Sequence, residues 1–480
     1  MEICENRRVY RSQRPEKLKT TSYAFLLSLI HKFHIPHLMH CCILLIGFIL
    51  FDYYIGGGYL VFVSENHETQ NDVLLINKLA LYYRTILGLL LIPTTIFNLI
   101  GLFVFDSFQN EVKLKVNPSK APFICFRFVT RGHYFELIKN NVEVLKNICF
   151  KLGMKRFVIQ VATETQLPLK EDEYVKQTVI PKDYVTKSGA LFKARVLQYC
   201  LEDGVNFLRD NDWIVHLDEE TKASENSIKG ILNFVSDGRY QLGQGMLIFL
   251  RENLMTNPLA LLDGWRVSDD LGKQRCQLKV FHHLVMEWKG TFFVVQAGAE
   301  KNISFDHGPD SSIAEDGYFG FIATKLGYKF NFLEGEMYEM SPTSVWDVIQ
   351  QRKRWIQGGL IIARSSEIPM RLKFIFCVSM YGILLSFCGV LPVVLRYSFP
   401  LPYPTFADLT SSLLFYFSVY YHSFGIIKSF TYFQTKNYMK LFLGVVIGNL
   451  MLIPNILLTN FAATLAFISK PKEFYVIKKD

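Results

Sequence analysis

Long apolar runs at both ends of the chain, with a charged stretch between them, constrain the fold more than any other feature of the sequence. A helix needs roughly 20 apolar residues to cross the hydrocarbon core of a bilayer. The runs that are long enough are 41–63, 85–105, 372–395, 406–427 and 439–468. We therefore predict two membrane helices, within 41–105, before a globular middle domain, 106–371, and two or three membrane segments, within 372–468, after it.

Two of these runs depart from a simple membrane helix. The first contains Asp52 and the triplet 56–58, which is Gly-Gly-Gly. A carboxylate within a membrane-spanning run is expected to lie against protein or near the membrane interface rather than in lipid. The last run contains Pro454 and Asn455 near its middle, so we expect it to be kinked or partly re-entrant.

The placement of lysine and arginine predicts the sidedness of the chain. The N-terminal segment 1–40 has seven Lys and Arg, whereas the loop 64–83 has one Lys and three acidic residues. Because cytosolic segments carry the excess of positive residues, we expect the N-terminus and the middle domain in the cytosol and the first loop in the lumen. The basic tail 469–480 also has a cytosolic character, but five complete spans would place it on the opposite side. The number of C-terminal spans therefore stays open between two and three.

Charge and cysteine content narrow the possible partners. The net charge is +9, and the basic residues stand beside the apolar runs, as in proteins that contact anionic lipid headgroups. No stripe of alternating basic and aromatic residues indicates a nucleic-acid partner. The nine cysteines include no C-x-x-C pair, which is typical of reduced thiols in the cytosol. The predicted partner is thus a lipid bilayer and not a nucleic acid.

The middle domain alternates short apolar runs with helical patterns, which predicts an α/β fold with parallel strands. The strands are expected at 124–129, 157–162 and 213–217, and the helices at 134–150 and 189–208. Polar or acidic residues follow the three strands, namely Thr130, Glu164 and Asp218. In parallel sheets ligands bind at the carboxyl ends of the strands, so these residues mark a candidate nucleotide site.

The acidic turn 218–220, Asp-Glu-Glu, is the sharpest local feature of the middle domain. Adjacent carboxylates repel one another unless a cation lies between them. A divalent ion with oxygen ligands, Mg²⁺ or Mn²⁺, held by Asp218 and Glu220, meets that need and would neutralise a nucleotide diphosphate. The alternative is a solvated turn in which Asp218 or Thr221 caps the following helix.

A second acidic pair, Glu315 and Asp316, opens a segment with helical character. Asp316 has the chemistry of a general base that would take a proton from an acceptor hydroxyl as this oxygen attacks a sugar. The alternative is that both acids only complement the dipole at the start of a helix.

The stretch 350–359 combines basic, amide and aromatic residues shortly before the first C-terminal apolar run. Arg354 can bind phosphate, and Trp355 offers a flat face for a sugar, with Gln351 beside them. The alternative is a basic helix that lies on lipid headgroups. Lys193 is either a phosphate ligand or an exposed helix lysine.

Taken together and in this order, these motifs resemble those of family-2 glycosyltransferases with the GT-A fold. The family has an early acid for the nucleotide base, a D-x-D-like metal motif, an E-D pair and Q-x-x-R-W before a membrane segment. The corresponding residues here are Glu164, Asp218 to Glu220, Glu315 with Asp316, and Gln351, Arg354 and Trp355. Two positions differ from the family pattern, since Glu164 replaces the usual Asp and the metal motif reads Asp-Glu-Glu.

The resemblance implies a cytosolic GT-A catalytic domain that inverts the sugar it transfers with Asp316 as base. It implies a donor site of Thr130, Glu164, Lys193, Asp218 and Arg354. On the acceptor and diphosphate side it places Glu315, Gln351 and Trp355, and at the metal Asp218 and Glu220.

Within the family, the stretches 129–132, 193–200, 216–221, 296–300, 304–308, 314–317 and 334–337 resemble the egghead-type β-1,4-mannosyltransferases of invertebrate glycosphingolipid synthesis. This resemblance implies GDP-mannose as donor, glucosylceramide as acceptor, and the membrane of the endoplasmic reticulum or Golgi as location. The alternatives are a processive polysaccharide synthase, a ceramide glucosyltransferase that uses a UDP-sugar, and a membrane scaffold without activity. A scaffold is disfavoured because all the acids are present.

Overall fold

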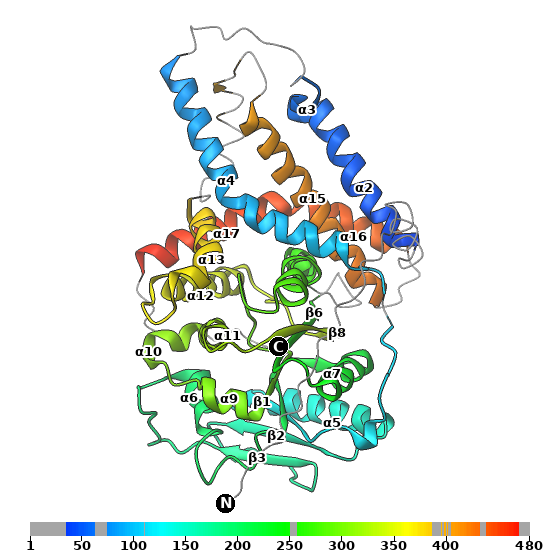
Figure 1. Cartoon of the computed structure of the whole chain (residues 1–480), viewed down its shortest axis with the longest axis vertical. Helices are drawn as coiled ribbons and strands as arrows, with labels where there is room; N and C mark the ends of the chain where they lie inside the picture. The colour runs from blue at the N-terminus through cyan, green and yellow to red at the C-terminus, as the bar shows by residue number, and fades with distance from the viewer. Residues whose placement is uncertain are drawn as a thin grey trace, which may run out of the picture.

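The computed structural model describes residues 35–62, 74–109, 111–249, 257–385, 405–432 and 438–469, together with 395, 398–399 and 401. A sheet covered by helices forms one part of the molecule, and long helices that stand beyond one edge of this part form the other (Figure 1). The basic N-terminal residues 1–34 and most of the basic tail lie outside the described residues, so the predicted sidedness stays a prediction.

One sheet of eight strands organises the described middle domain, in the order β3-β2-β1-β4-β7-β6-β8-β5. Strands β3, β2, β1 and β4 are parallel, β7 runs antiparallel to both of its neighbours, and β6 and β8 are parallel to each other. The strands are β1 Ile124–Thr130, β2 Phe157–Thr163, β3 Val175–Val179, β4 Trp213–Asp218, β5 Lys222–Ala223, β6 Leu242–Ile248, β7 Phe293–Gln296 and β8 Phe330–Tyr338. The predicted α/β fold with a parallel, Rossmann-like half is confirmed.

Helices cover both faces of this sheet, which explains why its central strands are almost continuously apolar. Helices α5 and α7 contact each other on one side, while α6, α9 and α11 lie on the other (Figure 1). Their bounds are α5 Phe135–Lys151, α6 Phe192–Tyr199, α7 Glu225–Asp237, α9 Ala297–Ile303, α10 Gly308–Ser311 and α11 Glu315–Lys325. Helix α6 is shorter than the predicted 189–208: positive φ angles at Gly189 and Phe192 interrupt a helical backbone at its start, and the helix ends at Tyr199, before Gly204, which also has a positive φ.

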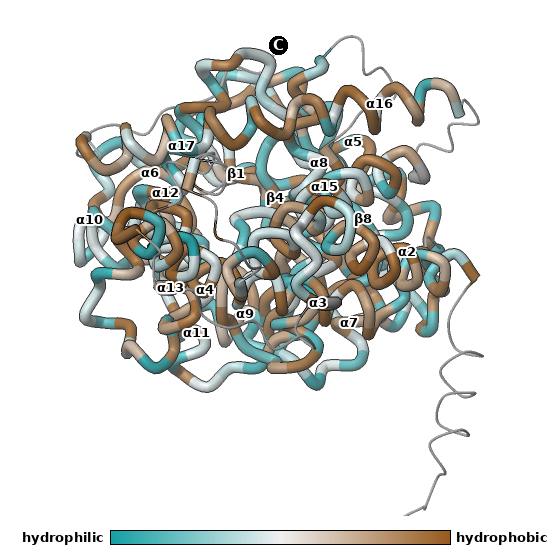
Figure 2. The backbone as a smooth tube through the Cα atoms, turned by 90° about the horizontal axis from the view of Figure 1, so that it is seen from above, coloured by the Kyte–Doolittle hydropathy of each residue, from teal (hydrophilic) through white to brown (hydrophobic). Residues whose placement is uncertain are grey.

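Two helices in the described part of the chain are long and apolar enough to cross a membrane, Ile35–Gly56 and Leu75–Val104. The first consists of α2 (Ile35–Phe51) and the π-helix η1 (Asp52–Gly56), and the second is α4. The bent pair α16 (Tyr438–Leu450) and α17 (Leu452–Ile468) adds a third if it counts as one span. Seen from above, α2 and α16 carry the apolar colour along much of their length (Figure 2).

Helix α2 is described from Ile35, several residues before the predicted start of the apolar run at 41. Its His37 is anchored on the end of α4, where its Nε2 donates to the carbonyl of Phe103 at 3.2 Å and its Nδ1 accepts from the amide of Ser107 at 3.3 Å. Asp52 is buried and accepts from the amide of Leu60 at 3.1 Å, so it lies against protein, as expected.

The C-terminal segments are only partly apolar. Helix α13 (Met370–Leu385) covers the first half of the predicted run 372–395, and most of the remainder lies outside the described residues. Helix α15 (Phe406–Tyr432) is 27 residues long, but its Asp408 forms a buried ion pair with Arg84 of α4 at 2.7 Å. The expected kink in the last run occurs at Met451, where α16 and α17 meet at 45°.

Glycines allow α4 and α15 to pack closely on the middle domain through α8 (Gly264–Asp269) and the π-helix η4 (Asp270–Gln274). A Cβ on Gly101 of α4 would lie 1.9 Å from the carbonyl oxygen of Gly272, and a Cβ on Gly425 of α15 would lie 1.8 Å from that of Gly264. These backbone contacts hold the segment α8–η4 between α4 and α15. The sheet is therefore attached to the membrane helices by direct helix packing.

We expect Gly425→Ala to destabilise the protein by about 1–3 kcal/mol, because the added methyl group would force α15 away from the backbone of α8. Thermal unfolding in one detergent measures this effect. Gly382→Ala is the matched control, since its Cβ would meet its nearest atoms at 3.2 Å and needs only a small adjustment. Equal melting temperatures for the two variants would contradict the tight packing of α8 against α15.

Candidate functional site

Four groups that the sequence analysis singled out meet around the backbone of Gly290. The ammonium of Lys193 donates to the carbonyl of Gly290 at 2.8 Å and forms an ion pair with Asp218. It also lies 3.8 Å from a carboxylate oxygen of Glu315. A Cβ on Gly290 would lie 3.1 Å from both Lys193 Nζ and Asp316 Oδ2. The end of β4 and the starts of α6 and α11 therefore form one site, and Lys193 is part of it rather than an exposed helix lysine.

The acidic turn after β4 faces this site and does not cap a helix. The amide of Asp218 donates to the hydroxyl of Thr291 at 3.1 Å. Glu219 is buried and accepts a hydrogen bond from the hydroxyl of Thr130, at the end of β1. Helix α7 has its own cap, because the Ser224 hydroxyl accepts from the amide of Ser227 in a complete capping box. The alternative in which Asp218 or Thr221 caps that helix is therefore wrong.

The acidic pair Glu315 and Asp316 lies in the first turn of α11, and Asp316 Oδ1 accepts from the amide of Gly317 at 2.7 Å. Burial and the neighbouring Asp316 raise the pKa of Glu315 to about 8, against the opposing charges of Lys193 and Arg354. Burial also raises the pKa of Asp316. Both acids lie where they complement the dipole of α11, which was the alternative interpretation. They also belong to the cluster of charges around Lys193, so the dipole is not their only interaction. A carboxylate with a raised pKa accepts a proton more readily, which suits a general base.

Glu339, just beyond the end of β8, is a further carboxylate of the site, and the sequence analysis did not identify it. Burial raises its pKa to about 8, and the negative charges of Glu220 and Asp218 act in the same direction, against Arg266. Its Oε2 is buried and has no hydrogen-bond partner among the described residues. Glu339 was not part of any candidate motif, and it reaches the acidic turn because β8 pairs with β6 on one side and with β5, which follows that turn, on the other.

Helix α12 (Val345–Arg364) carries Gln351, Arg354 and Trp355 and contacts α13 and α17. The charge of Arg354 acts on both acids of α11. The guanidinium of Arg266 lies between two rings, 4.7 Å from the ring centre of Trp355 and 3.7 Å from that of Phe249. Such cation–π contacts hold an aromatic ring in one orientation.

Arg352, next to these residues, points away from the site. It is buried and donates to the carbonyl of Asn455 at 3.1 Å and to the hydroxyl of Thr459 at 2.7 Å, both on α17. A helix lying on lipid headgroups would expose this arginine, so the alternative does not hold for Arg352.

The strand ends β2, β1 and β4 bring the remaining predicted residues to one edge. In the register of the sheet, Val129 of β1 is opposite both Ala162 of β2 and Asp218 of β4. Thr130 and Glu164 follow directly at this edge. Glu164 is about one third exposed and is held by Arg195 of α6 at 3.1 Å. The edge therefore has the exposed carboxylate that a nucleotide base would need.

Comparisons with known proteins identify relatives of this chain. The family model described as "Glycosyl transferase family group 2" matches residues 213–465. The protein named β-1,4-mannosyltransferase egh, from Drosophila melanogaster, is 41% identical over 449 residues, which cover 92% of this chain and 97% of that protein. β-1,4-Mannosyltransferase bre-3 from Caenorhabditis elegans is 40% identical over 452 residues, 93% of this chain and 98% of that protein. A solved mannosyltransferase from Pyrobaculum calidifontis, in complex with GDP-Man and Mn²⁺, has a TM-score of 0.44 and 10% identity, covering 79% of this chain and 99% of that chain.

Proposed function

This chain belongs to glycosyl transferase family group 2, and we propose that it is a β-1,4-mannosyltransferase that transfers mannose from GDP-mannose to glucosylceramide. The extent of its similarity to proteins named β-1,4-mannosyltransferases supports the activity. The observation that carries the proposal is the meeting of Asp218, Lys193, Glu315 and Asp316 around Gly290. This cluster provides an anionic site, a cation and a candidate base at the ligand-binding edge of the sheet.

The donor is proposed to bind along this edge. Glu164 and Thr130 lie where the guanosine part would be, and Lys193 and Arg354 supply positive charge for the diphosphate. Lys193 is held by Asp218 and by the Gly290 carbonyl, so its ammonium is fixed before the donor arrives. Fixed charges of this kind stabilise a leaving group without reorganisation.

A divalent metal, Mn²⁺ or Mg²⁺, fits the acids of the site. Asp218 and Glu220 would hold it, since carboxylate oxygens are the ligands that these ions prefer. The buried Oε2 of Glu339, which lacks a partner among the described residues, supports the fit, because buried carboxylates that face one another need a cation. When bound, the metal neutralises the diphosphate as it leaves.

Asp316 is proposed as the base of an inverting transfer. The 4-hydroxyl oxygen of the acceptor glucose forms a bond with the anomeric carbon of mannose, and the bond from that carbon to the diphosphate breaks. The hydroxyl proton passes to the Asp316 carboxylate, and GDP leaves on the opposite face. The raised pKa of Asp316 supports this role, because the carboxylate must hold the proton during the transfer.

The acceptor is proposed to reach the site from the bilayer along α12. Gln351 and Trp355 lie on this helix, which packs on α17 and α13 of the membrane region. Trp355 offers an aromatic face for the glucose unit, and Glu315 lies beside the base. A lipid acceptor accounts for a catalytic site packed directly on membrane helices, and we place it at the cytosolic face of the endoplasmic reticulum or Golgi membrane.

We expect purified protein in glucosylceramide-containing vesicles with Mn²⁺ to form mannosyl-glucosylceramide from GDP-mannose. Parallel reactions offer UDP-glucose or UDP-N-acetylglucosamine, with ceramide or without acceptor, and mass spectrometry identifies the products. Glucosylceramide made from UDP-glucose would indicate a ceramide glucosyltransferase instead. A polymer made without acceptor would indicate a processive synthase. Absence of every product, with GDP-mannose left intact, would contradict the proposal.

A further inference from the structure

The segment 285–291, here called the Lys289 loop, provides two hydrogen-bond acceptors to residues of the candidate site. The carbonyl of Gly290 accepts the hydrogen bond of Lys193, and the hydroxyl of Thr291 accepts that of the Asp218 amide. The Thr291 hydroxyl also pairs with that of Thr221 at 2.7 Å. Lys193 and the acidic turn thus depend on where this loop lies.

A hydrogen-bonded chain of three glutamine side chains holds the backbone of the Lys289 loop. Gln244 of β6 bonds both backbone groups of Lys289, donating to its carbonyl at 2.8 Å and accepting from its amide at 3.2 Å. Gln274 donates to Gln244, and Gln277 donates to Gln274. Gln277 also donates to the carbonyl of Glu287 at 2.7 Å and accepts from the amides of residues 285 and 286. Because each amide both donates and accepts, the chain has one direction and fixes one loop conformation.

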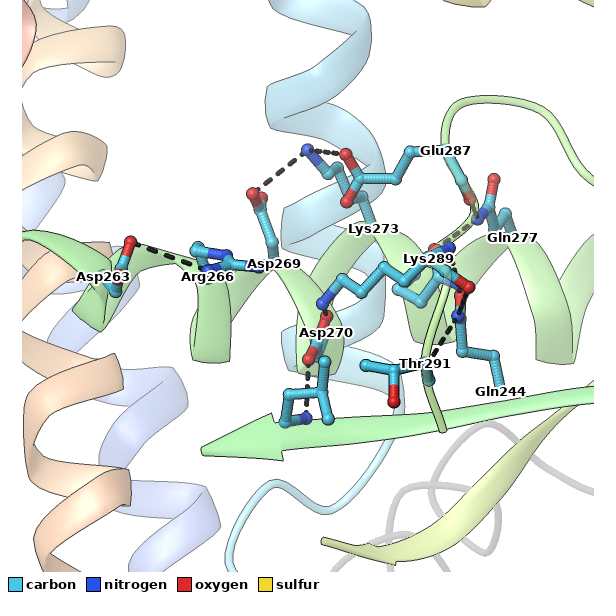
Figure 3. Close-up of polar contacts among 12 residues, drawn as sticks. Gln244, Asp263, Arg266, Asp269, Asp270, Lys273, Gln277, Glu287, Lys289 and Thr291 are labelled. Atoms are coloured by element: carbon cyan, nitrogen blue, oxygen red, sulfur yellow. Dashed lines mark hydrogen bonds and ion pairs between the residues drawn. The ribbon is translucent and has the colours of Figure 1, made fainter. Parts of the chain in front are cut away.

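Buried ion pairs tie the same loop to the segment α8–η4 (Figure 3). Lys289 pairs with Asp270, a fully buried carboxylate whose second oxygen accepts from the amide of Leu247 at 2.9 Å. Lys273 lies between Asp269 at 3.1 Å and Glu287 at 3.2 Å. Removing one partner of such a pair leaves the other charge buried and uncompensated. The pair Lys289–Asp270 therefore strongly favours the observed position of the loop.

The backbone that follows the loop is strained. Phe292 has φ of 49°, and a Cβ on Gly245 would lie 2.1 Å from its ring. A bulky residue in the left-handed region persists only where its surroundings over-determine it. The glutamine chain and the Lys289–Asp270 ion pair are the surroundings that hold the backbone in this conformation, next to Thr291.

The membrane helices contribute to the same network. The side chain of Asn98 in α4 accepts from the amide of Lys273 at 2.6 Å and donates to Asp269 at 3.3 Å. Tyr421 of α15 also donates to Asp269. A continuous set of hydrogen bonds and ion pairs thus runs from α4, a candidate membrane span, and from α15 to the Lys289 loop.

We propose that Lys289 and Asp270 are positioning residues, whose ion pair holds the Lys289 loop so that Gly290 and Thr291 fix Lys193 and Asp218 for the donor. Neither Lys289 nor Asp270 needs to touch the sugar for this role. The inference rests on the proposed function, since it assigns the loop to the same donor site. It also gives the membrane helices a part in setting that site.

The test compares full-length Lys289→Met, Asp270→Asn and Lys289→Arg with the wild type in the same vesicles. We expect Lys289→Met to lower kcat by roughly 10- to 100-fold and to raise the KM for GDP-mannose, because small misplacements of binding groups have effects of this size. The KM for glucosylceramide should stay unchanged. Lys289→Arg keeps the charge and should recover most of the activity.

Arg84→Met is the matched control, because it breaks another buried ion pair, with Asp408, far along α4 from the site. It should lower the melting temperature without changing either KM. Hydrogen exchange provides a readout that does not depend on catalysis. Amides 288–293 should lose protection in Lys289→Met and keep it in Arg84→Met.

Two outcomes separate this inference from the proposed function. The positioning role would be overturned, whatever product the enzyme makes, if Lys289→Met had the same hydrogen exchange as the wild type and the same KM and kcat, measured per amount of folded protein. If the wild type transfers no mannose while Lys289→Met loses the protection of the loop amides, the positioning role is supported and the mannosyltransferase is refuted.

Discussion

Asp316→Asn is expected to lower kcat for mannosyl transfer by roughly 10²- to 10⁴-fold, the usual contribution of a general base. The amide keeps the shape of the side chain and can still accept from the amide of Gly317, but it cannot take the acceptor proton. Binding of GDP-mannose and metal should remain, because the donor groups Lys193 and Asp218 are untouched. Initial rates with saturating substrates, together with Mn²⁺ titration, measure both effects.

Glu136→Gln is the control for this variant. Glu136 is also an acid in the first turn of a helix, α5, but it is exposed and away from the site. If the pair at the start of α11 served only the helix dipole, the two variants would have similar and small effects. Unchanged transfer by Asp316→Asn would remove the base from the mechanism.

Asp218→Asn is expected to abolish most transfer for a different reason. It removes a ligand of the proposed divalent metal and the ion-pair partner of Lys193. A bound metal contributes several kcal/mol to the stabilisation of developing charge, which corresponds to at least about 10²-fold in rate. Removing the metal from the wild type with a chelator should have the same effect, and adding Mn²⁺ or Mg²⁺ should restore activity. Paramagnetic resonance of Mn²⁺ measures binding separately from catalysis.

Asp237→Asn, at the exposed end of α7, is the control for loss of an acid, since Asp237 pairs only with the exposed Arg239 among the contacts of the described chain. The two catalytic variants should differ in one respect: Asp316→Asn should bind Mn²⁺ like the wild type and Asp218→Asn should not. Wild-type Mn²⁺ affinity in Asp218→Asn would contradict the assignment of Asp218 as a metal ligand.

The predicted strands and their ends agree closely with the structure because they depend on local patterns. The runs at 124–129, 157–162 and 213–217 became β1, β2 and β4, each one residue longer. An apolar run that ends in a polar residue identifies a buried parallel strand and its functional end. The region between β6 and β7 had no such pattern, because its helix contains π-turns and its polar residues are buried.

The acidic turn shows where local reasoning left two alternatives. From the residues alone, the turn could hold a metal through Asp218 and Glu220 or could cap the next helix through Asp218 or Thr221. The structure places the helix start at Ser224 and turns the carboxylate of Asp218 toward Lys193. The cap at Ser224 excludes the capping alternative, and the metal site remains a proposal.

Local patterns in the sequence were enough to predict apolar helices around an α/β middle domain, the parallel half of the sheet, and the residue types that we propose for the chemistry. These properties follow from the periodicity and spacing of neighbouring residues. The tertiary structure decided which side chains meet: Glu339 opposite Asp218 and Glu220, Arg266 against Trp355, and Lys289 on Asp270. Such contacts join residues that are distant along the chain, and the free energy that selects them comes from burying and pairing charges, which no local pattern records.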